Sequence, residues 1–189
     1  MRQNKYSDYK IVSFPEKIDS FRMGIITAPI YVRIKPINRC SHACHWCVYS
    51  DGTLRAKDRP EKHLQAGMHE EMNERDVMPT HRALELLEDL SAMGTKAVTF
   101  SGGGEPLLHK DIVQIMQHAL DRNIDLSIIT NGQQLNGARA KVLAHAKWVR
   151  VSIDYTSAEQ MAESRNVPTR FYGESIDNLR NFAAIKDKG

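Results

Sequence analysis

Three cysteines, the only ones in the chain, lie within eight residues: Cys40, Cys44 and Cys47. Their C-x3-C-x2-C spacing places three thiols on one short loop and offers no fourth. Structural zinc sites use four protein ligands, and most iron–sulfur proteins bind their clusters through four cysteines. Three thiolates leave one metal position open, and a small molecule can bind and react there. The loop therefore predicts a reactive metal site.

A glycine-rich segment, SGGGEP at residues 101–106, is the second unusual feature. Gly103 and Gly104 have no Cβ, so the backbone can approach a ligand closely there. Glu105 can accept hydrogen bonds from an ammonium group. The segment is not a phosphate-binding loop, because it lacks the Lys-Ser/Thr pair of such a loop. A simple glycine-rich turn is the alternative interpretation.

Polar residues also follow two later apolar runs. Asn131 stands in the sequence TNG, although Asn-Gly is a common turn dipeptide in its own right. Ser152 and Asp154 end the run VSID. Since alternate residues of a strand share one face, we expect both side chains to point in the same direction.

The predicted elements would bring these residues together. Strands are predicted over residues 30–34, 97–100, 124–130 and 148–154, and helices over 80–93, 112–123, 135–146 and 174–187. Four strand–helix units in succession predict an α/β fold with a parallel sheet, either open or curved into a barrel. The carboxyl ends of parallel strands meet at one edge, where ligands gather. Residues 1–27 read as a polar N-terminal arm and residues 28–189 as the core.

The composition excludes several classes of protein. The chain has 189 residues, a net charge of +3 and a mean hydropathy of −0.47. No stretch approaches the roughly 18 apolar residues of a membrane helix, and the N-terminus lacks the apolar centre of a secretory signal. The positive charge is small and dispersed, so no nucleic-acid partner is indicated. The odd number of clustered cysteines argues against disulfides, and we expect a cytoplasmic protein.

With these motifs in this order, the chain resembles the radical S-adenosylmethionine (radical SAM) superfamily. The cysteine loop, with the aromatic Trp46 before the last cysteine, is similar to the cluster loop of that family, and residues 103–106 are similar to its GGEP motif. The resemblance runs from about residue 30 to the C-terminus. It implies a partial (β/α) barrel of which about four strand–helix units are present, so we expect the core to be C-terminally incomplete.

The resemblance also implies cofactors. Cys40, Cys44 and Cys47 would bind a [4Fe–4S] cluster, and SAM would bind its fourth iron. Reduction of the cluster would cleave SAM, and the 5′-deoxyadenosyl radical would abstract hydrogen from a substrate. No protein residue is assigned to this step.

The same resemblance assigns the SAM contacts. Gly103, Gly104 and Glu105 would hold the methionine end of SAM. Trp46 would lie near adenine, and the other expected contacts are Asn131, Ser152 and Asp154. Arg165, expected in the loop after the fourth strand, would bind the SAM carboxylate, with a surface ion pair as the alternative.

The expected partners are an electron donor, a small-molecule or peptide substrate and a second chain that completes the barrel. Peptide modification is favoured, because SGGGEP and VSID resemble the peptide-modifying and molybdenum-cofactor branches. Two alternatives to an enzyme are a truncated, non-catalytic iron–sulfur module that acts through a partner and a zinc-binding module. In the zinc module His42 or His45 would be the fourth ligand; otherwise both histidines are expected to be polar loop residues.

Overall fold

One parallel sheet organises the chain. The structure is a computed structural model that describes residues 10–47, 49, 73 and 75–186. The strands lie in the order β1-β2-β3-β4, and their bounds are Tyr31–Ile34, Ala97–Phe100, Asp125–Thr130 and Trp148–Val151. This is the predicted α/β fold, with four parallel strands that alternate with helices.

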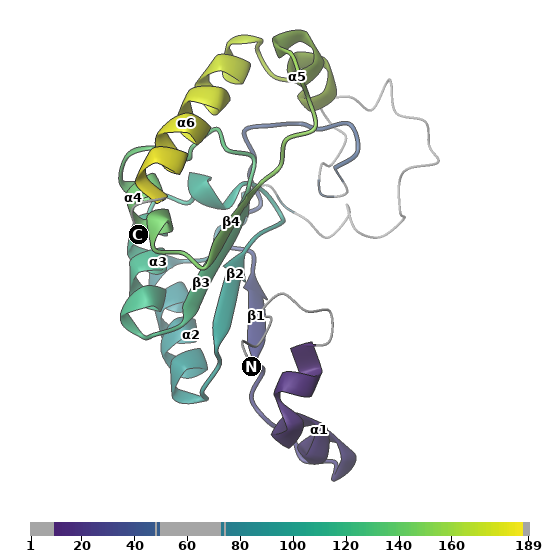
Figure 1. Cartoon of the computed structure of the whole chain (residues 1–189), viewed down its shortest axis with the longest axis vertical. Helices are drawn as coiled ribbons and strands as arrows, with labels where there is room; N and C mark the ends of the chain where they lie inside the picture. Colours follow the sequence, from purple (N-terminus) through teal and green to yellow (C-terminus); the bar gives the residue numbers. More distant parts are fainter. Residues whose placement is uncertain (1–9, 48, 50–72, 74, 187–189) are drawn as a thin grey trace.

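Helices cover one face of this sheet, as Figure 1 shows. They are α2 (Thr80–Ala92), α3 (Ile112–Asp121), α4 (Gly137–Ala144) and α6 (Arg170–Lys186). The register aligns Ile34 with Phe100, Ile128 and Val149 across the four strands. This row packs into the main core with the apolar sides of the helices. The odd-numbered residues of β1, β2 and β3 and the even-numbered residues of β4 lie on the opposite face.

Two elements end earlier in the structure than the sequence predicts. β4 stops at Val151 instead of residue 154, and Ile153, which lies beyond the end of the strand, is 45% exposed. α2 ends at Ala92, and Met93, the last residue of the predicted helix, lies just beyond it and is 51% exposed. Apolar residues near the end of an element continue its sequence pattern without having a partner to pack against.

The segment after β4 forms a helix that the sequence pattern did not reveal. α5 (Ala158–Arg165) is mostly polar, and only Met161 and Arg165 are buried in it. Its core is a separate apolar cluster centred on Tyr155, Met161 and Val167. The last helix, α6, also begins at Arg170, four residues earlier than predicted.

The described part of the N-terminal arm contains two short helices. A 3-10 helix, η1 (Lys10–Ser13), is followed by α1 (Pro15–Arg22), which buries no residue. Residues 1–9 of the predicted arm and residue 187 of the predicted last helix lie outside the described residues. Among the helices that the structure describes, none is long and apolar enough to cross a membrane.

Candidate functional site

The predicted site residues meet on the cysteine loop, beyond the carboxyl ends of the strands. Asn131, at the end of β3, places its Nδ2 3.1 Å from Ser41 Oγ and 3.9 Å from Cys40 Sγ. Arg165, from α5, places Nη1 3.7 Å from Cys44 Sγ. The segment after β2 hydrogen-bonds the chain that enters the loop, Gly104 N to Ile37 O at 2.8 Å. Residues far apart in the sequence therefore converge here.

The end of α5 supports the cysteine loop directly. The backbone N–H of Ala43 donates to Arg165 O at 2.9 Å, and that of His45 donates to Ser164 O at 3.2 Å. His45 Nε2 also lies 2.6 Å from Glu163 O. The last carbonyls of a helix have no donor within the helix. The loop supplies these donors on both sides of Cys44, so α5 fixes the position of the loop at this cysteine.

The two glycines of the GGEP segment allow a close approach between chains. A Cβ on Gly104 would lie 2.0 Å from Arg39 O, and a Cβ on Gly103 would lie 2.7 Å from Asn38 Oδ1. Gly103 also has a φ of +79°, which favours glycine. The sequence suggests that the glycines make room for a ligand. The structure shows that glycine is also required here because the chain from β1 into the cysteine loop packs against both residues.

Glu105 bonds to protein groups on both of its carboxylate oxygens. Its Oε1 accepts from Leu107 N at 3.0 Å and from Thr130 Oγ1 at 2.7 Å, and its Oε2 accepts from Asn131 N at 2.7 Å. The side chain is 2% exposed, and this burial raises the pKa of the carboxyl group. Glu105 was predicted to accept hydrogen bonds from an ammonium group. In the structure its carboxylate instead links the segment after β2 to the end of β3 by hydrogen bonds.

Arg165 is the last residue of α5, so its predicted location in a loop is wrong. It is 4% exposed, so it is not a surface arginine either. Its Nη2 and Nε lie 2.6 and 2.9 Å from Asp154 Oδ1, and Nη2 donates to Ser152 O at 3.0 Å. The guanidinium also lies 5.7 Å from the ring centre of Trp46, which is 54% exposed. Arg165 thus joins α5, the segment after β4 and the cysteine loop.

The residues after β4 contribute to the contacts of Arg165, although they lie beyond the end of the strand. Ser152 N still donates to Thr130 O at 2.9 Å, which continues the pairing with β3 by one residue. Asp154 has turned its Oδ1 toward Arg165. The structure therefore brings Ser152 and Asp154 to the predicted site, but through Arg165 rather than on one strand face.

His42 lies in the loop, as expected, but its side chain is buried there. Only 7% of it is exposed, and among the described residues neither ring nitrogen has a hydrogen-bond partner. Burial and, next, the charge of Arg165 lower the pKa of its imidazole to about 4. Within the described ranges, no three His, Cys, Asp or Glu side chains are placed to hold a single metal ion.

The thiols fit a metal cluster chemically. Although Cys40 is exposed, partial desolvation by the surrounding protein groups raises the pKa of its thiol to about 12. Burial also raises the pKa of Cys44, although the charge of Arg165 opposes it. Such thiols stay protonated at neutral pH unless a metal stabilises the thiolate. Three thiolates from one loop suit a cluster with one open iron better than a closed zinc site.

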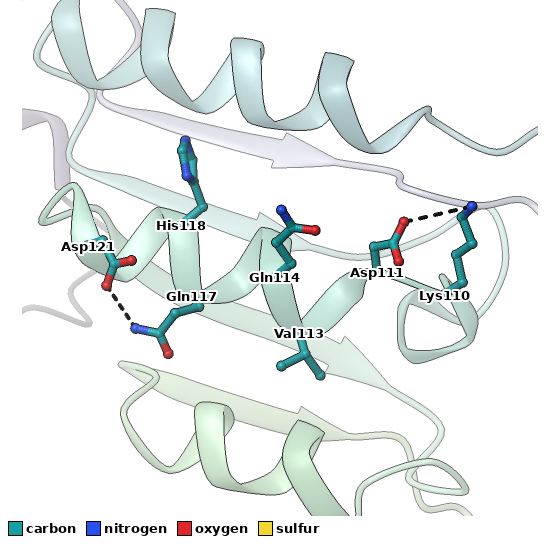
Figure 2. Close-up of a pocket in the computed structure, with 7 residues that line it drawn as sticks. All are labelled: Lys110, Asp111, Val113, Gln114, Gln117, His118 and Asp121. Atoms are coloured by element: carbon teal, nitrogen blue, oxygen red, sulfur yellow. Dashed lines mark hydrogen bonds and ion pairs between the residues drawn. The ribbon is translucent and has the colours of Figure 1, made fainter.

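A surface pocket elsewhere does not share these features. Figure 2 shows it along α3, where Lys110 pairs with Asp111 and Gln117 bonds to Asp121 at 2.8 Å. His118 in the same pocket lies 3.1 Å from Glu88. Its charged side chains already have protein partners, and the cysteine loop contributes no residue to its lining. We assign it no role in the site.

Comparisons with known proteins agree with the resemblance. The chain is 26% identical over 151 residues to an S-adenosylmethionine-dependent nucleotide dehydratase of Lacinutrix mariniflava, covering 76% of this chain and 29% of that protein. It is 29% identical over 164 residues to a GTP 3′,8-cyclase of Lactiplantibacillus plantarum, covering 82% and 44%. A PqqA peptide cyclase of Xanthomonas euvesicatoria is 28% identical over 167 residues, covering 86% and 38%. The chain spans less than half the length of these relatives.

Solved structures share the fold. The crystal structure of Streptococcus suis SuiB bound to S-adenosylmethionine superposes with a TM-score of 0.63 at 20% identity, covering 96% of this chain and 39% of that one. BtrN in complex with AdoMet and 2-DOIA gives a TM-score of 0.51 at 18% identity, covering 70% and 49%. The model of the radical SAM superfamily matches residues 34–187, which is most of the chain. The chain therefore belongs to the radical SAM superfamily.

Proposed function

We propose that this chain binds a [4Fe–4S] cluster through Cys40, Cys44 and Cys47, binds SAM, and is part of an enzyme that abstracts hydrogen from an organic substrate. When bound, the cluster supplies the electron that cleaves SAM to methionine and a 5′-deoxyadenosyl radical. The observation that carries the proposal is the convergence of β2, β3 and α5 on the cysteine loop. Family membership supports the same cofactors.

In this proposal the protein holds the cysteine loop in place and presents hydrogen-bond donors to the cofactors. Asn131 is fixed by accepting from Gln133 N on Oδ1 at 3.0 Å, so its Nδ2 points to the loop beside Cys40. The buried charge of Arg165 stabilises a thiolate at Cys44, and its remaining donor capacity suits the carboxylate of SAM. Glu105 acts by positioning Asn131 and does not itself contact SAM in this proposal.

The remaining SAM contacts follow the sequence prediction. Trp46 presents an exposed ring next to Arg165, which suits stacking on adenine. Backbone groups at Gly103 and Gly104 would meet the amine of the methionine part. Ser152 would face the ribose, whereas Asp154 would act through Arg165, because its Oδ1 is already paired there.

The relatives suggest two classes of substrate. Two are enzymes of nucleotides by name and one is a peptide cyclase by name, and SuiB was also crystallised bound to its precursor peptide SuiA. Peptide modification remains our preference from the sequence motifs. An electron donor is required, and a second chain that completes the barrel would pair with β4, which bonds within the described sheet only to β3.

Anaerobic reconstitution tests the proposal. We expect iron and sulfide to bind, a [4Fe–4S]+ EPR signal after reduction with dithionite, and a change of that signal when SAM is added. The variant Cys44→Ala should lose the signal, whereas Ser41→Ala, in the same loop, should keep it. Mass spectrometry should then detect 5′-deoxyadenosine after reduction.

Other outcomes lead to the alternative functions. A cluster whose spectrum does not respond to SAM would support the non-catalytic iron–sulfur module. Tightly bound zinc without iron would overturn the proposal and support a zinc-binding module. A spectrum that responds to SAM without 5′-deoxyadenosine would limit the chain to cofactor binding.

A further inference from the structure

The end of α1 exposes large apolar side chains. We call this surface the apolar tip and define it by Phe21, Met23, Ile25 and Ile26. These residues are 86%, 65%, 53% and 99% exposed, in that order. Three of them, Ile26, Phe21 and Met23, are the most exposed large apolar residues of the described part of the chain. Single exposed apolar residues are common on soluble proteins, but four within six residues mark an interaction surface.

The backbone after α1 brings the four residues together. Ile25 N donates to Ser20 O at 2.9 Å, and Gly24 N donates to Phe21 O at 3.1 Å. With Gly24 at a φ of +69°, these two bonds form a Schellman motif, which turns the chain at the end of the helix. Ile25 therefore lies beside the last turn of α1, and the apolar tip is one continuous patch.

The arm is attached to the sheet at the end opposite the cysteine loop. Lys17 Nζ donates to Ala28 O at 2.9 Å, and Thr95 Oγ1 donates to Pro29 O at 2.9 Å. These bonds fix the chain between α1 and β1. Figure 1 shows α1 at the amino end of β1, standing away from the rest of the sheet. The apolar tip is therefore held outward and is not folded onto the described core.

The charges around the apolar tip cancel. α1 carries two acids and two bases, Glu16, Asp19, Lys17 and Arg22, and Arg22 pairs with Asp19 at 3.8 Å. Helices that lie on membranes have a polar face rich in Lys and Arg, and nucleic acids also require an excess of positive charge. α1 has no such excess. An apolar surface without net charge is complementary to itself, so two copies can meet on it about a twofold axis without repulsion.

The apolar tip is large enough for a dimer. An exposed aliphatic side chain has roughly 100 Å² of apolar surface and a phenylalanine about 200 Å². Scaled by the exposed fractions, the tip presents roughly 400 Å² per copy. Interfaces are about 60% apolar, so an interface centred on the tip would bury about 650 Å² per copy, or about 1,300 Å² in all. Specific interfaces bury about 1,200–2,000 Å² in total.

We propose that the chain forms a twofold dimer in which the apolar tips of two copies pack against each other. Phe21 and Ile26, the two most exposed residues of the tip, would lie at its centre. The proposal does not depend on the cofactors, because α1 and the cysteine loop lie at opposite ends of the sheet. Each copy would therefore keep its candidate site open.

Sedimentation velocity of the whole cluster-loaded chain tests this proposal. From about 1 to about 300 µM protein, we expect the mass to rise from that of one chain, 21.5 kDa, toward twice that value. Phe21→Asp and Ile26→Asp should each raise the Kd of the dimer at least a hundredfold, because each would bury an unpaired carboxylate in an apolar contact. Ile185→Asp is the matched control, since Ile185 is an exposed apolar residue on α6, and it should leave the Kd unchanged.

Two further measurements separate loss of contact from loss of fold. Because α1 buries no residue, the variants at Phe21 and Ile26 should have the urea midpoint of wild type at the lowest protein concentration. A photo-crosslinker, p-benzoylphenylalanine in place of Met23, should join two copies. Mass spectrometry of mixed ¹⁴N and ¹⁵N protein should map the cross-link to α1 or to residues 21–26 of the second copy.

The dimer is overturned if the chain stays monomeric at the highest concentration, or if F21D and I26D dimerise as wild type does. Cross-links that fall within one chain, or on another region of the second copy, also overturn it. The EPR response to SAM should be the same in F21D and I26D as in wild type. A wild-type protein that dimerises without this response would reject the proposed function alone, and a monomer that shows the response would reject the dimer alone.

Discussion

Arg165 links three parts of the candidate site at the scale of single residues. Its buried guanidinium contacts Asp154, the carbonyl of Ser152 and the sulfur of Cys44. Loss of one partner leaves the other charge without compensation, and this costs more when the remaining charge is buried. Asp154 is partly exposed and can regain water, whereas Arg165 cannot. We therefore expect the loss of Asp154, which leaves Arg165 buried without a partner, to destabilise the protein more than the loss of Arg165.

A double-mutant cycle with Arg165→Met and Asp154→Asn measures the interaction of the two side chains, and its single variants compare the cost of losing each one. We expect a coupling of about 1–3 kcal/mol in the free energy of unfolding, measured by urea denaturation of the metal-free protein. The exposed pair Arg180–Asp177, at 3.5 Å on α6, is the control and should couple by less than about 0.5 kcal/mol. Equal couplings for the two pairs would contradict the role given to Arg165.

Glu105 predicts a dependence of stability on pH. Burial raises the pKa of its carboxyl group above the ordinary 4.5, against the opposing hydrogen bonds from Asn131, Thr130 and Leu107. The folded protein therefore holds this proton more tightly than the unfolded chain does. Its contribution to stability is fully present below pH 4.5 and is lost as the pH rises through the raised pKa, at up to about 1.4 kcal/mol per pH unit.

The comparison of wild type with Glu105→Gln isolates this effect, because glutamine does not titrate. The difference in unfolding free energy, wild type minus variant, should fall as the pH is raised from 4.5 toward 7.5. Urea unfolding curves at several pH values measure it, and Glu85→Gln on the exposed side of α2 is the control. A difference that stays constant or increases with pH would show that burial does not govern Glu105.

At the scale of elements, the cysteine loop is held between the segment after β2 and the end of α5. The β2 side depends on Gly104, because any Cβ there meets the carbonyl of Arg39 at 2.0 Å. Backbone atoms cannot move aside as a flexible side chain can. A substitution at Gly104 therefore has to displace the chain that leads into Cys40.

Gly104→Ala should destabilise the protein by about 1–3 kcal/mol and reduce the iron bound on reconstitution. Gly173→Ala is the matched control: Gly173 lies in α6 with nothing within 4 Å of the position that a Cβ would take, and alanine there should add about 0.5–1 kcal/mol of stability. Urea denaturation and iron analysis check both variants. Normal iron content in Gly104→Ala would mean that the loop does not depend on this contact.

At the scale of the whole molecule, the proposed metal site connects both ends of the described sheet. The cysteine loop follows β1, and its supports come from β3 and from α5 beyond β4. A cluster that binds only the folded arrangement stabilises the entire domain by mass action. Cluster binding and global stability should therefore change together.

Cluster-loaded protein should unfold at a higher urea concentration than metal-free protein under anaerobic conditions. Removing the cluster by oxidation and chelation should return the midpoint to the metal-free value. In Cys44→Ala the two preparations should unfold alike, since the site lacks one ligand. Equal midpoints for loaded and metal-free wild type would show that the cluster loop is energetically separate from the rest of the domain.

The sequence by itself determined the strands, their parallel arrangement and the cysteine loop as the candidate metal site. Apolar runs and spaced apolar residues are local signals, and they identified β1 to β4 to within a few residues. The C-x3-C-x2-C spacing and GGEP are equally local, because the chemistry needs these residue types close together in the chain. The residues predicted at the strand ends do gather at one edge.

Only the tertiary structure decided what the polar groups at this edge do. Arg165 and Cys44 are 121 residues apart in sequence, and Glu105 and Asn131 are 26 apart. No local pattern shows that Glu105 bonds to protein, that Asp154 pairs with Arg165, or that His42 is buried. α5 was missed because it is polar and short and packs on a separate apolar cluster. Hydrogen-bond partners depend on which segments pack together, and that depends on the whole fold.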